Sequence, residues 1–299
     1  NVDYNSALEL FDKEKYSAAQ DKFSMVYKST MDKKSEVAIN AKYYMALCGL
    51  NLFNTDAENL FVEFINDYPD SPKIKQAYFY LGSYHFRGKK YEEALVWFNK
   101  IDALDLSEEE LAEYRFKVGY SYFSLENFDE ASKHFYEIKD YDNQYTSPAR
   151  YYYGHIAYLQ KKYESALQTF LLLNNDEKFS PITPYYISQI YYLQGKYDKV
   201  IEYAPALLDT ALPARSAEIA RIIGESYYRT KKYNEAIPYL SRFHKEKAAL
   251  ATRADFYQLG FAYFKTDSCD NAINWFKKSI GEADSISQAA HYHMAECYI

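Results

Sequence analysis

Residues 81–98 read LGSYHFRGKKYEEALVWF, and the pattern within them recurs eight times along the chain. The small residue Gly82 is followed twelve residues later by Ala94, and four residues after that comes Phe98. We call the place of Ala94 the anchor of a repeat. The eight anchors are Ala19, Ala57, Ala94, Ala131, Ala166, Val200, Ala236 and Ala272, at spacings of 34–38 residues. A fixed period of this length is typical of a solenoid, in which each helical unit buries its apolar face by stacking on its neighbours.

Small and large residues alternate in register across the repeats. The small places are Ala7, Met45, Gly82, Gly119, Gly154, Ser188, Gly224 and Gly260, and the places four residues after the anchors are Phe23, Phe61, Phe98, Phe135, Phe170, Ala204, Leu240 and Phe276. A glycine inside a helix costs about 1 kcal/mol relative to alanine. Five glycines at one place therefore predict that a second helix approaches the first one closely there. We expect Gly119→Leu or Ala131→Leu to overpack the pair.

The pattern resembles the tetratricopeptide repeat (TPR), an antiparallel helix pair of about 34 residues. The family's Leu-Gly pair and the tyrosine that follows it have counterparts here in Leu81-Gly82, Ile223-Gly224 with Tyr227, and Leu259-Gly260 with Tyr263. The resemblance covers the whole chain. It implies an all-α, right-handed α-solenoid of about eight TPR hairpins plus one unpaired C-terminal helix, and a non-catalytic scaffold that binds a protein or peptide.

We predict a single solenoid over residues 1–299. The repeats are expected at about 1–33, 34–72, 73–109, 110–145, 146–178, 179–214, 215–250 and 251–284, with a partial repeat at 285–299. The partial repeat lacks its second helix, which indicates a fragment of a longer protein. Two prolines, Pro205 and Pro238, are expected inside second helices, where the missing N–H kinks a helix.

Composition narrows the class of partner. The formal net charge is −7 and the pI is about 5.5, which argues against a nucleic-acid partner and mildly favours a basic peptide. No run of 18 apolar residues occurs, so no membrane-spanning segment is expected. The 35 tyrosines suit a fold with a large helical surface, where a ring can pack while its hydroxyl stays in water.

The reactive residues do not predict an enzyme. Cys48, Cys269 and Cys297 follow no paired motif, and we interpret them as small buried thiols. His293 and Cys297 share a helix face, but a metal site needs three or four ligands, so we expect no metal and no cofactor. No nucleophile elbow, phosphate loop or zinc-protease motif occurs, so no catalytic residue is predicted.

The resemblance implies a binding groove lined by the first helices of the hairpins. When the small residue is numbered eighth in a repeat, the fifth, ninth and twelfth residues share one helical stripe. The candidate partner-binding residues are Phe79, Ser83, Phe86, Phe116, Tyr120, Phe123, Tyr151, His155, Tyr158, Tyr185, Gln189, Tyr192, Arg221, Glu225 and Tyr228. The alternative is that the aromatic residues at the fifth and twelfth places mainly pack on adjacent helices. The ninth place varies most, so we expect it to set selectivity.

A finer resemblance concerns the cellular location. Phe61-x-x-Phe64-x-x-x-Tyr68-Pro69-x-Ser71 is similar to the repeats of bacterial cell-envelope TPR proteins of the BamD-like outer-membrane assembly type. It implies a periplasmic or cell-envelope location and a role in envelope assembly, with the cytoplasm as the alternative.

Two other functions stay open at this point. The repeats could be the docking or regulatory arm of an enzyme or signalling protein whose catalytic domain lies outside this chain. The incomplete C-terminal repeat could also mediate self-association, because an uncovered apolar helix invites a partner chain.

Overall fold

The computed structural model describes residues 2–208 and 213–299. Within these ranges the chain forms seventeen α-helices, three short 3-10 turns and no strand, which confirms the predicted all-α fold. The chain divides into two compact units, Asn1–Ala149 (unit 1) and Arg150–Ile299 (unit 2). Each unit is described by itself.

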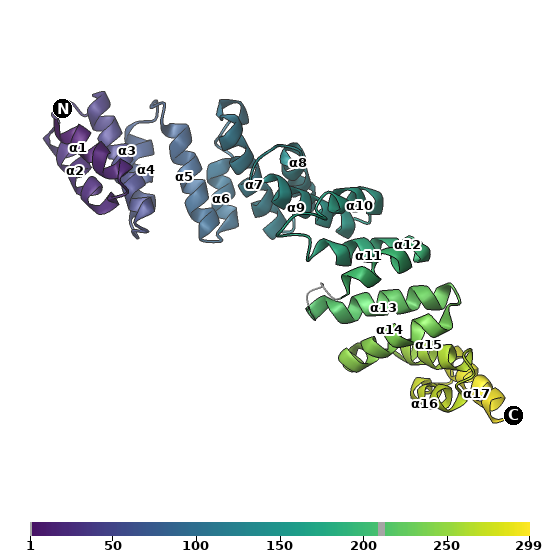
Figure 1. Cartoon of the computed structure of the whole chain (residues 1–299). Coiled ribbons are helices and arrows are strands. Elements are labelled where there is room, and N and C mark those ends of the chain that lie inside the picture. The colour runs from purple at the N-terminus through teal and green to yellow at the C-terminus, as the bar shows by residue number, and fades with distance from the viewer. Residues whose placement is uncertain (1, 209–212) are drawn as a thin grey trace. The chain divides into compact units, whose positions relative to one another are not determined.

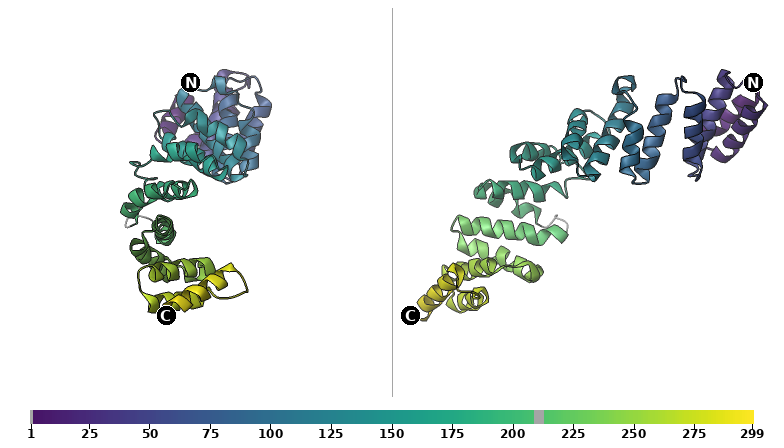
Figure 2. Two further views of the ribbon diagram at one scale, coloured as in Figure 1. Left: turned by 90° about the vertical axis from the view of Figure 1, so that its right-hand side faces the viewer. Right: turned by 180° about the vertical axis from the view of Figure 1, so that it is seen from behind.

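Unit 1 is built of four hairpins of consecutive helices that pack side by side (Figures 1 and 2). Its helices are α1 (Val2–Asp12), α2 (Tyr16–Ser29), α3 (Glu36–Asn51), α4 (Ala57–Asp67), α5 (Ile74–Arg87), α6 (Tyr91–Phe98), α7 (Glu108–Ser124) and α8 (Phe128–Ile138). A 3-10 turn, η1 (Ala103–Asp105), joins α6 to α7. The first helices contact one another in the order α1, α3, α5 and α7. They therefore present one continuous row of side chains within this unit.

Unit 2 continues the same arrangement and ends on an unpaired helix. Helix α9 (Thr146–Leu159) begins four residues before the boundary between the units, and α10 (Tyr163–Leu171) completes its hairpin. The remaining elements are α11 (Thr183–Leu193), α12 (Tyr197–Tyr203), η2 (Pro205–Leu207), α13 (Pro213–Arg229), α14 (Tyr233–Glu246), η3 (Ala248–Leu250), α15 (Arg253–Phe264), α16 (Cys269–Ser279) and α17 (Ser285–Tyr298). Helix α17 packs on both α15 and α16.

Two helices begin before the repeat boundaries expected from the sequence. Helix α7 begins at Glu108 and α13 at Pro213, two residues before the expected boundaries at 110 and 215. A capping box explains the first case: the Ser107 hydroxyl accepts a hydrogen bond from the Glu110 N–H, and the Glu110 carboxylate accepts one from the Ser107 N–H. Such a cap satisfies two N–H groups that a helix start leaves unpaired. It therefore fixes the helix start before the first apolar residue of the repeat.

All eight hairpin turns share one backbone closure. One residue in each turn has a φ between +56° and +70°, and these residues are Glu14, Phe53, Lys89, Glu126, Lys161, Gly195, Lys231 and Asp267. The next residue donates its N–H to the carbonyl five places earlier, as in Lys90 N to His85 O at 2.9 Å. This is the Schellman closure of a helix C-terminus, which favours glycine at the left-handed position. Seven of the eight turns adopt it without glycine.

The spacing of small and large residues that recurs from repeat to repeat has a direct cause in the packing. The anchor alanines are fully buried, and so is the aromatic ring that follows four residues later in most repeats. A Cβ built on Gly82 would lie 2.6 Å from Cδ1 of Phe98, and one built on Gly260 would lie 2.8 Å from Cδ1 of Phe276. The predicted close approach is confirmed, because a methyl group would occupy the place of the ring.

The two prolines behave differently from each other. The expectation that Pro205 lies inside a second helix is wrong, because α12 ends at Tyr203 and Pro205 begins the 3-10 turn η2. Pro238 lies inside α14 as predicted. A proline is tolerated at the first position of a helical turn, where its missing N–H would be unpaired anyway. The second helix of the repeat that contains Pro205 is therefore short: it ends at Tyr203, and a separate 3-10 turn follows it.

Two of the three cysteines form a disulfide. Cys269 at the start of α16 is bonded to Cys297 on α17, with Cα atoms 5.4 Å apart. The interpretation of these two residues as buried thiols is therefore wrong, and the Cys297 sulfur is bonded and not a metal ligand. The 28-residue separation matches no local motif, and the pair forms because α17 packs back on α16. Cys48 is a free, buried thiol, and burial raises its pKa to about 12.

Candidate functional site

The aromatic residues at the fifth place pack against their own hairpin. The ring centroids of Phe79 and Phe98 lie 6.1 Å apart, and those of Phe116 and Phe135 lie 5.9 Å apart. In these two repeats the fifth-place ring thus packs on the buried ring that follows the anchor. This contact fixes the outer ring in one orientation, because an aromatic pair prefers a tilted or edge geometry at this separation.

The aromatic residues at the twelfth place close the hairpins near their turns. Phe86 lies 6.0 Å from Tyr91, and Tyr192 lies 5.7 Å from Tyr197, both in edge-to-face geometry. Tyr228 and Tyr233 repeat the contact at 5.6 Å. The aromatic residues at the twelfth place therefore do pack on neighbouring helices, which was the alternative to partner binding.

The candidate residues remain partly accessible all the same. Fourteen of the fifteen predicted partner-binding residues are half-buried, and the exception is Glu225, which is 6 % exposed. A ring that packs on one side and meets solvent on the other can contact a partner without changing its place. Binding at these residues stays a prediction.

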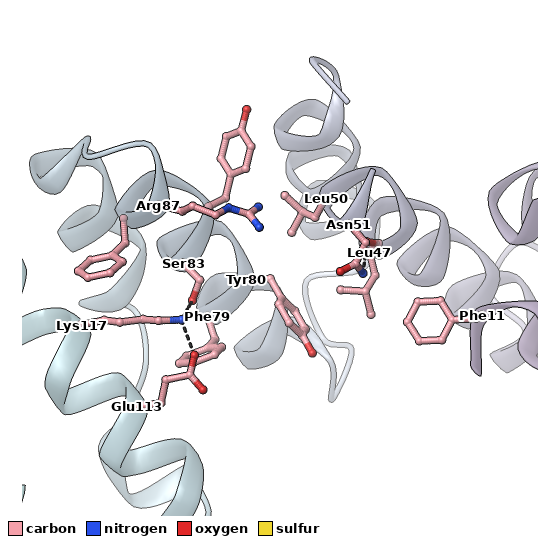
Figure 3. Close-up of a pocket in the computed structure, with 12 residues that line it drawn as sticks. Phe11, Leu47, Leu50, Asn51, Phe79, Tyr80, Ser83, Arg87, Glu113 and Lys117 are labelled. Atoms are coloured by element: carbon pink, nitrogen blue, oxygen red, sulfur yellow. Dashed lines mark hydrogen bonds and ion pairs between the residues drawn. The ribbon is translucent and has the colours of Figure 1, made fainter. Parts of the chain in front are cut away.

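A pocket of about 490 Å³ opens in unit 1 among the first helices (Figure 3). Its walls combine aromatic and aliphatic side chains with a few polar groups. The lining residues are Phe11 of α1, Leu47, Leu50 and Asn51 of α3, Phe79, Tyr80, Ser83, Tyr84, Phe86 and Arg87 of α5, and Glu113 and Lys117 of α7. Three predicted residues, Phe79, Ser83 and Phe86, lie in this lining. An apolar hollow with few oriented polar groups is the usual form of a binding site.

Lys117 crosses one wall of this pocket. Its ammonium donates a hydrogen bond to the Ser83 hydroxyl at 2.8 Å and pairs with the Glu113 carboxylate one helical turn away. It also lies over the Phe79 ring, 5.0 Å from the centroid. These contacts, visible in Figure 3, tie α7 to α5 and leave the charge of Glu113 balanced.

Arg87 lies at the other wall and joins a second hollow. Its guanidinium stacks over the Phe53 ring at 4.5 Å from the centroid, and Phe53 is 68 % exposed. The second hollow measures about 280 Å³ and is lined by Phe53, Tyr84, His85, Arg87, Gly88 and Lys90. The two hollows share Tyr84 and Arg87. Arg87 therefore stands at the border between an apolar pocket and a basic one.

In unit 2, residues of the same helical stripe form hydrogen bonds and ion pairs with one another and with adjacent residues. The Tyr185 hydroxyl donates to Glu218 at 2.8 Å, and Tyr192 donates to Glu225, so both hydrogen bonds link α11 to α13. Arg221 then donates to Glu225 at 2.8 Å. We call these residues, together with Asp255, the polar ladder.

The ladder continues into the next hairpin. The Arg221 guanidinium lies 3.1 Å from Asp255 of α15, so one arginine bridges two carboxylates. The side chains of Glu225 and Asp255 are only 8 % and 6 % exposed. Buried carboxylates are stable as charges only when they are paired. Burial also raises the pKa of Tyr185 to about 12, with the Glu218 hydrogen bond as the second cause.

The opening beside the ladder is small. It measures about 200 Å³ and is lined by Gln189, Tyr192, Glu218, Arg221, Ile222, Glu225, Phe243 and Leu250. Four predicted residues, Gln189, Tyr192, Arg221 and Glu225, are therefore brought together, but three of them already hold one another. A ligand here would have to compete with these internal bonds.

His155 takes part in an aromatic stack. Its ring lies nearly parallel to that of Tyr151, at an interplanar angle of 18°, and 5.3 Å from the Tyr186 ring. Burial lowers the pKa of His155, and the charge of Arg215 lowers it further. The imidazole is therefore neutral at pH 7 and acts as a flat, weakly polar part of the first-helix surface.

Several lining residues were absent from the sequence prediction. Glu113 holds the second place of its repeat, Lys117 the sixth, and Arg87 the thirteenth. The second and sixth places precede the predicted fifth and ninth places by three residues, and the thirteenth follows the ninth by four, so all three lie beside the predicted stripe. Extending the stripe by one further row would have identified them.

Other kinds of site have less support. Within residues 2–208 and 213–299, no three His, Cys, Asp or Glu side chains gather closely enough to hold a metal ion. Across the same described ranges, every helix is too short or too polar to cross a bilayer.

Comparison with known proteins agrees with this architecture. The sequence profile of the tetratricopeptide repeat matches residues 52–109, which run from the end of α3 to the start of α7 and hold the central wall of the unit 1 pocket. The chain matches no curated protein.

Three solved structures align with the chain at low identity. The C-terminal part of a TPR repeat-containing protein from Cytophaga hutchinsonii is 18 % identical, with a TM-score of 0.52, and the alignment covers 74 % of this chain and 87 % of that chain. MamA (AMB-1) is 16 % identical, with a TM-score of 0.50, over 60 % of this chain and 93 % of that one. A tetratricopeptide repeat protein from Parabacteroides merdae is 16 % identical, with a TM-score of 0.47, over 87 % and 99 %. At such identities the first two alignments show the fold alone.

Proposed function

We propose, on the premise that this is a tetratricopeptide repeat protein, that the chain is a non-catalytic scaffold binding an extended segment of a partner protein. The observation that carries the proposal is the 490 Å³ pocket of unit 1, which four first helices line. Its aromatic and aliphatic walls supply the buried contact area from which most binding energy comes.

The arrangement favours an extended segment over a small molecule. The lining residues come from α1, α3, α5 and α7, so the pocket is part of a row that runs from hairpin to hairpin. An extended chain can place successive side chains along such a row. The fifteen predicted residues remain our proposed contact set, to which the pocket adds Phe11, Leu47, Leu50 and Arg87.

Peptide selection tests this proposal. The full chain is immobilised and used to select from a display library of random peptides, and the selected peptides are then titrated by fluorescence anisotropy. Ser83→Trp places a large neutral ring in the pocket wall and should weaken binding at least about tenfold, because it fills the hollow. The matched control is Ser165→Trp on α10, whose residue is exposed and outside both pockets. The proposal fails if no peptide is enriched, or if both variants bind like the original chain.

We further propose that the chain works in a cell envelope, outside the cytoplasm. The resemblance to bacterial envelope repeat proteins suggests this location, and the Cys269–Cys297 disulfide supports it independently. Disulfides persist in oxidising compartments such as the periplasm and are rare in the cytosol.

Thiol labelling in the native cells tests the location. Cells are lysed in denaturant with a heavy maleimide reagent, with and without prior reduction. An envelope protein should add one label, at Cys48, before reduction and three afterwards. Three labels without reduction would place the chain in a reducing compartment. The Cys48→Ser variant, which should show no label before reduction, identifies the single reactive thiol.

A further inference from the structure

The charge of the unit 1 opening is opposite to that of the chain. The whole chain has a net charge of −7, which by itself favours a basic partner. The two adjoining hollows instead contain the cations Arg87, Lys90 and Lys117 and a single carboxylate, Glu113, among their lining residues. Since Lys117 pairs with Glu113, Arg87 and Lys90 are the remaining cations of the lining, and a further carboxylate, that of Glu58, lies 3.2 Å from His85 of the second hollow.

Arg87 is the cation best placed to bind a ligand. Among the described residues no carboxylate lies within ion-pair distance of its guanidinium, which stacks on the face of the Phe53 ring. Figure 3 shows the guanidinium reaching from α5 toward Leu50 of α3. The ring holds the guanidinium over its face, while the edge of the group keeps its N–H donors for an acceptor.

The neighbouring wall is apolar. Leu47 and Leu50 are 7 % and 5 % exposed and close the floor of the pocket. The half-buried rings of Phe79 and Phe86 supply apolar area that a large apolar side chain can cover. Arg87 and Leu50 line the same pocket, so a carboxylate at Arg87 and an apolar side chain against Leu50 would come from residues close together in one extended segment.

We infer that unit 1 binds an extended segment in which an acidic residue lies close to a large apolar residue. The carboxylate pairs with Arg87 at the border of the two hollows, and the apolar side chain enters the 490 Å³ pocket. This inference rests on the proposed scaffold function and names the chemistry of the partner. Charge complementarity of this kind sets specificity and association rate.

The library selection described above gives the first readout. Enriched peptides should pair Asp or Glu with Phe, Leu, Tyr or Trp within two positions more often than the starting library does. Two synthetic peptides with capped ends then isolate the charge: one alternates glutamate with phenylalanine, and the other replaces each glutamate by lysine. The glutamate peptide should bind the full chain at least about tenfold more tightly at low salt, and high salt should reduce this ratio.

Variants at Arg87 test whether this residue causes the preference for the glutamate peptide. Arg87→Glu should abolish the preference for the glutamate peptide and shift it toward the lysine peptide. Lys28→Glu is the matched control, because Lys28 is an exposed lysine of α2 outside both hollows and the variant also places a glutamate where the chain has a cation. It should leave the ratio of the two affinities unchanged. Circular dichroism of both variants checks that the helices are retained.

The outcomes separate the two proposals. Enrichment of acidic–apolar pairs together with the Arg87→Glu reversal supports the inference. Peptides enriched without such pairs, or equal binding of the two synthetic peptides, overturn it and leave the scaffold function standing. A selection that enriches no peptide overturns both.

Discussion

The two units use the same helical stripe for opposite purposes. In unit 1 the stripe borders a pocket of about 490 Å³, and Arg87 is held by a ring instead of a carboxylate. In unit 2 the stripe is occupied by the polar ladder, and the adjacent opening measures about 200 Å³. Residues that the repeat does not need for its own hairpin can thus serve a partner or join neighbouring hairpins. The prediction from sequence, which treated both halves as one groove, missed this difference.

The two tryptophans make the comparison measurable. Trp97 lies in unit 1 and Trp275 in unit 2, so a Trp→Phe change at one leaves the other to report its own unit.

Removing the arginine of each unit should give the largest contrast. Arg221→Met removes the cation shared by two buried carboxylates, so Glu225 is left with the Tyr192 hydroxyl and Asp255 with its Thr252 donors. We expect a loss of about 3–5 kcal/mol in unfolding free energy. Arg87→Met removes an exposed stacking contact and should cost below about 1 kcal/mol. Urea unfolding followed by tryptophan fluorescence measures both. Equal losses in the two variants would contradict the structural role assigned to the ladder.

Acid should weaken unit 1 through His134. Burial lowers the pKa of His134 to about 4, and the charge of Arg115 is the second cause. Because the unfolded side chain titrates near 6.5, the unfolded state binds the proton first. Stability present above pH 6.5 is therefore lost as the pH falls toward 4, by about 3 kcal/mol. His134→Gln should flatten this dependence in unfolding curves recorded with Trp97 as the reporter. A variant that keeps the full acid slope would show that other groups cause it.

The glycines of the two units should respond differently to a methyl group. A Cβ on Gly224 would lie 2.9 Å from the backbone nitrogen of Leu240, whereas one on Gly119 meets side-chain atoms of His134 and Phe135 at 3.1 Å. Gly224→Ala forces the helices apart and should lower stability by about 1–3 kcal/mol. In Gly119→Ala the gain in helix propensity, about 1 kcal/mol, offsets a small adjustment of the ring. Thermal unfolding of the two variants compares them, and a larger loss at Gly119 would reverse the order expected here.

Substitutions in the hairpin turns should have the smallest effects on stability, and the effects should be opposite in sign in the two units. Lys89 of unit 1 adopts a left-handed φ of +58°, so Lys89→Gly should stabilise the turn by about 0.5–1 kcal/mol. Gly195 of unit 2 has a φ of +70° with no atom near its Cβ direction, so Gly195→Ala should destabilise by a similar amount. Differential scanning calorimetry resolves shifts of this size. A stabilised Gly195→Ala would contradict the assignment of backbone strain.

The sequence predicted the helix pairs well because their packing is local. The distance from Gly82 to Phe98 is set within one hairpin, so a fixed spacing of residues reports a fixed contact. The polar ladder and the disulfide depend on residues about 30 positions apart, such as Tyr192 with Glu225 and Cys269 with Cys297. The two tyrosine–glutamate pairs share a separation of 33 residues, about one repeat, but which residue types meet across that separation depends on how the hairpins stack. Pro205 was misplaced for a similar reason, because a helix can end and a new turn can start within two residues.

The covalent bond between Cys269 and Cys297 also determines how proteolytic cleavage between α16 and α17 would be detected. The segment between α16 and α17, from Ile280 to Asp284, lies inside the ring that the bond closes. A protease that cut this segment would release no fragment, because α17 would remain attached through sulfur. Electrophoresis without a reducing agent would show one band of unchanged mass, and only treatment with dithiothreitol would reveal the nick.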